Sequence, residues 1–188
     1  MKDVLIFNDI VKDEVIQDIT RHILSMPYWR VAWEGKPGEN RKYRFDEPDM
    51  GFSMQTFCRN IDNNNPTSGT VPEFERLNHL ANMVAQNVTK RISKAMYFTL
   101  WRIMWNYYSP TSKGDWHNDM DTDNYVSIVF NLHTNDGSTE FKDRGIVPSV
   151  RNQAIFFPSN ILHKGNPPVN DTKRLNLNLV LKKESRND

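Results

Sequence analysis

Cysteine is almost absent from this sequence, which contains one, Cys58, among 188 residues. A single thiol cannot form an internal disulfide, so a disulfide scaffold and a cysteine-based zinc site are both excluded, and a reducing environment is indicated. Long hydrophobic runs are absent as well. No stretch reaches the roughly 18 to 20 uncharged apolar residues that a membrane-crossing helix needs, and the mean hydropathy is −0.68. The apolar run Val4–Phe7 is too short for a secretory signal, so we expect a soluble, cytoplasmic protein.

An excess of charge of one sign is also missing, because 24 Lys and Arg face 23 Asp and Glu, for a formal net charge of +1. Such a chain has no overall field that gathers nucleic acid or an anionic membrane, so either partner requires a local patch. The length and the 38% hydrophobic content fit one domain over residues 1–188. Aromatic residues make up 11% of the chain, enough to fill the core of a β-sandwich.

Two segments have apolar residues at helical spacing, Val15 to Leu24 and Leu77 to Ile92. Between residues 28 and 70 we expect two or three short strands joined by long loops. From residue 96 the pattern becomes that of strands, at about 96–108, 125–132, 139–142, 153–158 and 174–181. This order predicts an α+β protein with a jelly-roll (double-stranded β-helix) core at about 96–182, preceded by an N-terminal part at about 1–95 whose helices pack on it.

The pair His117 and Asp119 is the first candidate for chemistry. On an extended chain, residues two apart point to the same face, so both side chains are able to approach one ion. The pattern alone is weak, since about 0.4 occurrences of His-x-Asp are expected by chance in a chain of this composition. Asp121 lies on the same face and remains an alternative to Asp119.

A second histidine, His163, follows an apolar strand and a turn, and completes a set of two histidines and one carboxylate. This facial triad leaves three adjacent positions open on iron(II), as non-haem oxygenases require. A third element is the alternating strand from Lys173 to Leu181, with leucines on one face and Arg174 on the other. If Arg174 faces the same cavity, its planar guanidinium is suited to hold a carboxylate with two hydrogen bonds.

In their order and spacing these residues resemble the motifs of the iron(II)/2-oxoglutarate-dependent dioxygenases, especially the compact prolyl-hydroxylase-like and phage-encoded members. The resemblance covers the C-terminal half of the chain. The matching positions are Tyr108, Pro110, His117, Asp119, Asp136–Phe141, Ala154–Ser159, His163, Pro168, Val169 and Arg174. Two positions depart from the pattern. Ser138 replaces the second glycine of a turn, and Pro167 lengthens the interval before the arginine, which leaves Lys173 and Arg174 both as candidates, although alignment on Pro168 and Val169 favours Arg174.

The resemblance implies that His117, Asp119 and His163 bind iron(II). It also implies that Arg174 holds the distal carboxylate of the cosubstrate 2-oxoglutarate, with Tyr108 as a further hydrogen-bond partner. The expected activity is that of a dioxygenase that uses O2 to hydroxylate a substrate and releases succinate and CO2. The substrate expected from this branch is a prolyl or other amino-acid residue, a free amino acid or a small molecule. A membrane partner is not expected, and a nucleic acid is not favoured.

Several other residues have both a functional and an ordinary interpretation. His133 is close enough in sequence to a strand end to approach the metal, but a histidine at a loop edge is the commoner case. Trp116 either walls the site or belongs to the core. His22 and His79 fit surface positions of helices. Basic residues also occur in two places. Those around 41–44 fit a substrate lid, a nucleic-acid patch or, equally well, a solvated loop packed by its aromatic residues, and those at the C-terminus fit a frayed, solubilising tail: Arg41, Lys42, Arg44, Lys182, Lys183 and Arg186.

Two other functions are alternatives to the hydroxylase hypothesis. Asn106 and Tyr108, together with Arg174 and Asn176, are similar to motifs of the nucleic-acid alkylation-repair dioxygenases. That group has a second arginine six residues after the first, where this chain has Val180. The other competitor is a jelly-roll module that binds a metal without catalysing a reaction.

Overall fold

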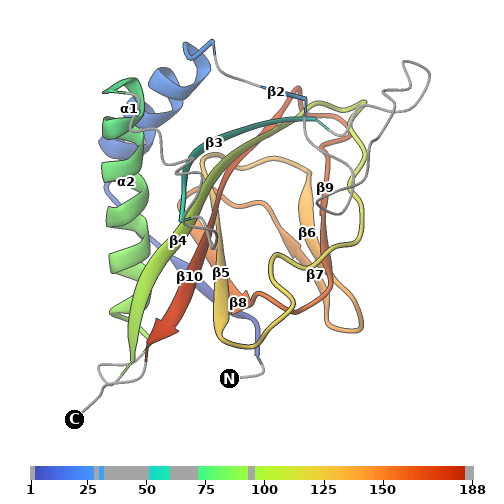
Figure 1. Cartoon of the computed structure of the whole chain (residues 1–188). Helices are drawn as coiled ribbons and strands as arrows, with labels where there is room; N and C mark the ends of the chain where they lie inside the picture. Colours follow the sequence, from blue (N-terminus) through green and yellow to red (C-terminus); the bar gives the residue numbers. More distant parts are fainter. Residues whose placement is uncertain (1–2, 28–29, 32–50, 60–71, 93–95, 185–188) are drawn as a thin grey trace.

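The structure is a computed structural model that describes residues 3–27, 30–31, 51–59, 72–92 and 96–184. In this part of the chain, two antiparallel sheets lie face to face, and two helices cover the outer side of the larger sheet (Figure 1). A small apolar cluster that includes Val129, Phe141 and Phe157 fills the space between the sheets. The arrangement is that of a mostly antiparallel β-sandwich of the jelly-roll kind, as the strand pattern predicts.

The larger sheet has seven strands in the order β1-β8-β5-β10-β4-β3-β2. Their bounds are β1 Leu5–Asn8, β2 Arg30–Val31, β3 Phe52–Cys58, β4 Tyr97–Tyr108, β5 Tyr125–Asn131, β8 Gln153–Pro158 and β10 Arg174–Glu184. Strand β10 lies in the middle and is buried on both faces. Leu175 and Leu177 belong to the main core on the helix side, while Arg174 and Asn176 are buried on the side of the smaller sheet.

The smaller sheet has three strands in the order β7-β6-β9, with β6 at Ser138–Phe141, β7 at Gly145–Pro148 and β9 at His163–Asn166. Beyond β9, His117 forms an isolated antiparallel bridge with His163. The segment around His117 therefore extends this sheet by one position. From β4 onward, the chain passes back and forth between the two sheets, and this brings residues distant in sequence together at one end of the sandwich.

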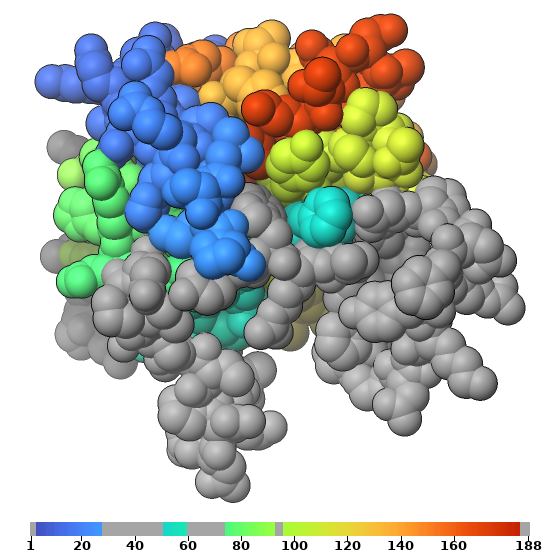
Figure 2. Space-filling view, turned by 90° about the horizontal axis from the view of Figure 1, so that it is seen from above, coloured from blue at the N-terminus to red at the C-terminus, as the bar shows by residue number. Residues whose placement is uncertain are grey.

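The two helices are α1, Asp13–Leu24, and α2, Pro72–Thr89. Ile16, Ile19 and Ile23 of α1 are completely buried, and each such side chain contributes about 1.5–3 kcal/mol by leaving water. They share one core with α2 and with the inner strands of the larger sheet. Figure 2 shows the N-terminal segment and α1, in blue, lying beside α2, in green. The helices thus close the outer face of the sheet and leave its inner face for the site.

Both helices, and the strands β4, β5, β6, β8 and β10, lie within a few residues of the positions that the sequence predicts. The prediction of a frayed tail is wrong for Lys182 and Lys183, because β10 continues through them to Glu184. The predicted basic patch at 41–44, most of the segment 28–70 and Arg186 lie outside the described residues. Within the described residues, no helix is both long and apolar enough to cross a membrane.

Candidate metal centre

The bridge between two backbone segments places His117 and His163 side by side. The N–H of each residue donates to the carbonyl of the other, at 2.9 Å in both directions, and the two imidazole rings lie 4.5 Å apart between centroids. Asp119 follows two residues later on the same segment, where its N–H donates to the carbonyl of Ser159 at 2.9 Å. The ligand atoms of His117, Asp119 and His163 all lie within 4.8 Å of one another.

Hydrogen bonds fix the orientation of both imidazoles. Nδ1 of His117 lies 2.9 Å from the carbonyl oxygen of Asp115, and Nδ1 of His163 lies 2.9 Å from that of Ile161. Because a carbonyl only accepts, each Nδ1 carries the proton, and each Nε2 is left with its lone pair free for a metal. Nε2 of His163 is 3.8 Å from Oδ2 of Asp119. Two imidazole nitrogens and a carboxylate oxygen with open positions form a donor set that suits iron(II).

The centre is buried on one side and open on the other. The side chains of Asp119 and His163 are each 3% exposed, whereas His117 is exposed. Burial lowers the pKa of His163, so its imidazole is neutral near pH 7, the state in which it binds a metal. A ligand is therefore able to approach from the side of His117.

Three side chains that the sequence analysis missed hold the Asp119 carboxylate. The Ser127 hydroxyl donates to Oδ2 at 2.6 Å, and the Asn178 amide donates to the same oxygen at 3.2 Å. Nη2 of Arg102 donates to Oδ1 and forms an ion pair with it. Burial alone raises the pKa of Asp119, but Arg102, both imidazoles and the Ser127 hydroxyl outweigh it and hold the pKa far below its usual range. The carboxylate is thus charged and fixed in place before any metal arrives.

Arg174 is completely enclosed, with 1% of its surface exposed. Nη2 donates to Oγ1 of Thr139 at 2.8 Å and Nη1 to the carbonyl of Asn166 at 3.1 Å, while Nε has no partner in the part of the chain that the structure describes. Among the described residues no carboxylate forms an ion pair with it. Burial lowers its pKa to about 10, still high enough to keep it charged. A buried cation with only neutral partners is costly unless an anion binds to it.

Two glycines lie close against the Arg174 side chain. A Cβ added at Gly165 would lie 2.9 Å from Nη1 of Arg174 and 3.0 Å from the Tyr108 hydroxyl, and one added at Gly137 would lie 2.9 Å from Cδ of Arg174. The Tyr108 ring lies 5.4 Å from the guanidinium carbon. A side chain at position 165 would press on both polar groups, so glycine is required there; we call Arg174, Tyr108 and Gly165 together the cradle.

A row of amide side chains, of which Asn106 is half-buried and the others are buried, lies between this cradle and the metal centre. Register pairs Gln153 with Asn131, Asn131 with Asn176, and Asn176 with Asn106, across four neighbouring strands. The Asn106 amide donates to the Asn176 oxygen at 3.0 Å. Nδ2 and Oδ1 of Asn131 are both buried and have no partner among the residues that the structure describes. Because buried polar groups are usually hydrogen-bonded, these amides are suited to bind a polar ligand.

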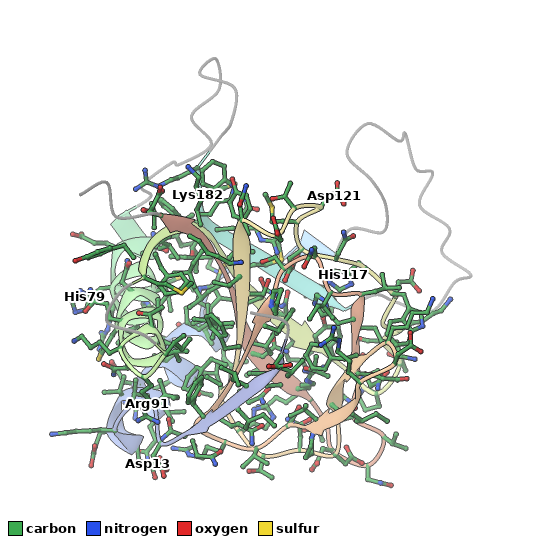
Figure 3. The ribbon with its side chains drawn as sticks, turned by 90° about the horizontal axis from the view of Figure 1, so that it is seen from below. Asp13, His79, Arg91, His117, Asp121 and Lys182 are labelled. Carbon is green, nitrogen blue, oxygen red and sulfur yellow. The ribbon has the colours of Figure 1, made fainter. Side chains whose placement is uncertain are left out.

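The structure separates the remaining candidates from the centre. Asp121 accepts a hydrogen bond from Asn118 at 2.9 Å and is not part of the cluster, and Figure 3 shows it near His117 but at the edge of the molecule. His133 contacts the Lys173 carbonyl at 2.9 Å. Trp116 is 41% exposed and lies beneath the Lys164 ammonium, so it belongs neither to the core nor to the group of ligand atoms.

The position of Lys173 differs from that of its neighbour Arg174. Lys173 is only half-buried, whereas Arg174 lies inside the sandwich opposite Tyr108. A separate cleft of about 910 Å³ lies at the surface and does not include the three ligand residues. Its lining residues are Asp123, Lys142, Asp143, Arg144, Pro158, Asn160, Ile161, Leu162 and Lys183.

No protein-family model and no curated protein sequence matches this chain. Solved structures do match it. A 2OG-Fe(II) oxygenase-family oxidoreductase from Burkholderia pseudomallei superimposes with a TM-score of 0.68 at 12% identity, over 95% of this chain and 84% of that one. HygX from Streptomyces hygroscopicus, with nickel and 2-oxoglutarate bound, has a TM-score of 0.61 at 11% identity, over 96% of this chain and 83% of that one. A Pseudomonas putida prolyl-4-hydroxylase has a TM-score of 0.53 at 15% identity, over 98% of this chain and 94% of that one. At these identities the likeness establishes a shared fold.

Proposed function

We propose that this chain, which has the fold of the 2-oxoglutarate/iron(II) oxygenases, is itself an iron(II)- and 2-oxoglutarate-dependent dioxygenase. One observation carries the proposal. Two histidines and an aspartate, from two stretches distant in sequence, place their ligand atoms within 4.8 Å of one another, in the same interior as an enclosed guanidinium that has no acidic partner among the described residues. A metal and a dicarboxylate together satisfy both features.

The strand order supports the finer description of the core. From β4 to β10 the chain crosses repeatedly between the two sheets, with β6 and β7 as consecutive strands of the smaller one, and a double-stranded β-helix is likewise wound between two sheets. In this proposal, residues of about 96–182 form the catalytic core, and the N-terminal part of about 1–95 supplies the packing helices and faces the substrate. All of 1–188 then acts as one oxygenase domain.

Each site residue has a role that follows from its contacts. His117, Asp119 and His163 would hold iron(II), with Asp119 supplying a charge that Ser127 and Asn178 keep in place. Arg174 and the Tyr108 hydroxyl would hold the distal carboxylate of 2-oxoglutarate in the cradle beside Gly165. When bound, iron(II), 2-oxoglutarate and O2 supply the oxidising chemistry, in which succinate and CO2 are released and a C–H bond of the substrate is hydroxylated.

The solved structures suggest the substrate class. They include prolyl hydroxylases from a bacterium and a Chlorella virus, and one from Trichoplax adhaerens in complex with a peptide. We therefore propose a prolyl or other amino-acid residue as the substrate and the cytoplasm as the site of action.

One observation keeps an alkylation-repair activity as a second candidate. The arginine that this group has on the last strand is Val180 here, but the residue opposite Val180 on β4 is Arg102. The neighbouring strand β4 thus supplies a guanidinium beside the position where the repair enzymes have their second arginine. Binding of single-stranded DNA that weakens steeply with salt is expected for this activity, whereas binding that salt does not affect would count against it.

Anaerobic titration with iron(II) and 2-oxoglutarate tests the main proposal. Chelation of the metal by the cosubstrate gives a visible charge-transfer band, which His117→Ala and His163→Ala should each abolish. His79→Ala is the matched control, because His79 is exposed on α2, on the opposite side of the view from His117 (Figure 3). Absence of the band in the wild type, or its persistence in His163→Ala, would contradict the proposal.

A screen for succinate release then identifies the substrate. Peptides, free amino acids and nucleic acids are supplied as separate pools, with His163→Ala as the blank. Release that depends on the peptide or amino-acid pool is expected. Release that depends only on nucleic acid would instead favour the repair activity.

A further inference from the structure

Arg102 is a second guanidinium on the inner face of the larger sheet. It lies on β4 opposite Val180, while Arg174 lies six residues away on β10, opposite Tyr108. At about 3.3 Å per residue, these two rows are separated by roughly 20 Å along the strands. Of these two rows, the one with Arg102 is nearer to Asp119, whose carboxylate accepts hydrogen bonds from Arg102 and from Asn178 on β10. Arg174 and Arg102 therefore lie on different sides of the metal centre.

The hydrogen bonds of Arg102 leave much of its guanidinium free. Among the described residues only Nη2 has hydrogen-bond partners, Oδ1 of Asp119 and, at 3.1 Å, Oδ1 of Asn178. Nε is buried and has no partner in the described part of the chain, yet 21% of the side chain is exposed. An arginine that only oriented Asp119 would gain nothing from a buried, unpaired N–H, which costs about 1–3 kcal/mol. A ligand on the open side would reach the exposed part of this side chain and give the guanidinium an anionic partner other than Asp119.

The charges of the loaded centre favour an anion at this place. Among the described residues, Asp119 is the acidic group paired with Arg102, and in the loaded centre it also serves the metal. A dication and two guanidinium groups then face one aspartate and one doubly charged cosubstrate, which leaves positive charge in excess. Because the cosubstrate's distal carboxylate is assigned to Arg174, this excess lies on the side of Arg102.

We propose that Arg102 binds a carboxylate of the substrate, so that the enzyme oxidises an acidic compound or residue whose carboxylate lies within reach of β4. This inference rests on the proposed function and makes it narrower, because a neutral prolyl peptide has no group for Arg102. The planar guanidinium suits a carboxylate, which it holds with two parallel hydrogen bonds.

Side-chain NMR of the full chain tests the proposal without turnover. The ¹⁵N-labelled protein is loaded with zinc(II) and 2-oxoglutarate, and the Nε–H resonances of the two arginines are assigned with Arg102→Lys and Arg174→Lys. Acetate is then titrated, with acetamide as its uncharged counterpart of the same shape. We expect acetate to shift the Arg102 resonance to saturation, and acetamide to leave it unchanged. The dissociation constant for acetate should rise at least tenfold in Arg102→Gln and by less in Arg102→Lys, which keeps the charge.

Three results would overturn the proposal. The first is equal responses to acetate and acetamide. The second is acetate binding that is unchanged in an Arg102→Gln variant shown to be folded by its melting temperature. The third is an Arg102 resonance that responds to 2-oxoglutarate and then no longer to acetate, which would assign this arginine to the cosubstrate. Failure of the proposed function is seen separately, as absence of the iron(II) charge-transfer band.

Discussion

At the scale of single residues, the Asp119 carboxylate depends on a serine hydroxyl. Ser127 donates to Oδ2 at 2.6 Å and lies 2.8 Å from the Ser159 hydroxyl. Without it, Asp119 keeps only Arg102 and Asn178 of the three side chains that hold it, and the loss of such a supporting partner typically weakens a metal site 10- to 100-fold. We expect Ser127→Ala to lower the zinc(II) affinity by about that factor, as measured by competition titration with a chelator.

Ser149→Ala is the control for this measurement. The Ser149 side chain is buried, and its hydroxyl has no hydrogen-bond partner within the described ranges, so the substitution removes a buried hydroxyl that does not contact Asp119. We expect an unchanged zinc(II) affinity. Equal affinities of the Ser127 and Ser149 variants would show that the hydroxyl does not position the ligand.

Gly165 gives the second prediction at this scale. A methyl group at this position would occupy the space between Nη1 of Arg174 and the Tyr108 hydroxyl, where the distal carboxylate of the cosubstrate is proposed to bind. Gly165→Ala should therefore weaken 2-oxoglutarate binding at least tenfold, about 1.4 kcal/mol, and leave the zinc(II) affinity unchanged. Calorimetric titration of each ligand separates the two effects. Normal 2-oxoglutarate affinity in this variant would remove the cradle from the proposal.

The sequence identifies these site residues unequally. His117, Asp119 and His163 are found because histidine and aspartate at fixed spacings are uncommon enough to be noticed. Arg102 has no such signal, since an arginine on a strand is ordinary and its partner lies 17 residues away on another segment. The only available hint is that Arg102 and Tyr108 lie on the same face of the predicted strand, an even number of residues apart.

At the scale of elements, a local sequence pattern predicts the strands that are strongly apolar and misses those that depend on tertiary pairing. Strands β5, β8 and β10 are rich in apolar and β-branched residues and lie in the centre of the larger sheet. Strands β7 and β9 have four residues each, and the sequence of β9, HKGN, has no strand-forming residue. Their pairing with β6 is what makes them strands, and this pairing is a tertiary effect that a local pattern does not contain.

The loop between β9 and β10 determines how His163 and Arg174 are joined. The Asp136 carboxylate accepts hydrogen bonds from the N–H groups of Val169, at 3.0 Å, and Asn170, at 2.7 Å. These bonds, that of Asn170 first, lower the pKa of Asp136 below its ordinary value. Because the pKa is lowered on folding, the stabilisation is complete above the pKa of the unfolded chain, about 3.9, and is lost as the pH falls through the lower folded value.

Asp136→Asn is therefore expected to lower the urea midpoint of unfolding at pH 7, and the difference from the wild type should shrink as the pH falls below about 4. Asp143→Asn is the matched control, because Asp143 is an exposed turn residue with a positive φ of 60° that asparagine also tolerates. The control should follow the wild type at every pH. A difference that stays constant from pH 7 to pH 3 would show that the carboxylate charge has no part in holding the loop.

At the scale of the whole molecule, one asparagine joins the beginning of the chain to the larger sheet. Asn152 lies between β7 and β8. Its Oδ1 accepts from the N–H groups of Ile10, at 3.0 Å, and Val11, at 3.1 Å, and its Nδ2 donates to the Val11 carbonyl at 2.7 Å. The backbone of Asn152 has a left-handed φ of 61°. These contacts fix the segment between β1 and α1, and hence the position from which α1 packs against the core.

Replacement of Asn152 separates the side-chain contribution from that of the backbone. Asn152→Gly removes the three hydrogen bonds and leaves the buried Ile10 N–H unpaired, for an expected loss of about 2–4 kcal/mol in the free energy of unfolding. Asn152→Ala adds the cost of a left-handed Cβ, about 1–2 kcal/mol, so it should be the less stable of the two. Urea denaturation measures both. Because the partners of Asn152, Ile10 and Val11, are not among the metal ligands, the folded fraction of either variant should keep its charge-transfer band. Two variants of equal stability would show that the backbone at this position is unstrained, and loss of the band in folded protein would show that the N-terminal segment helps to shape the metal centre.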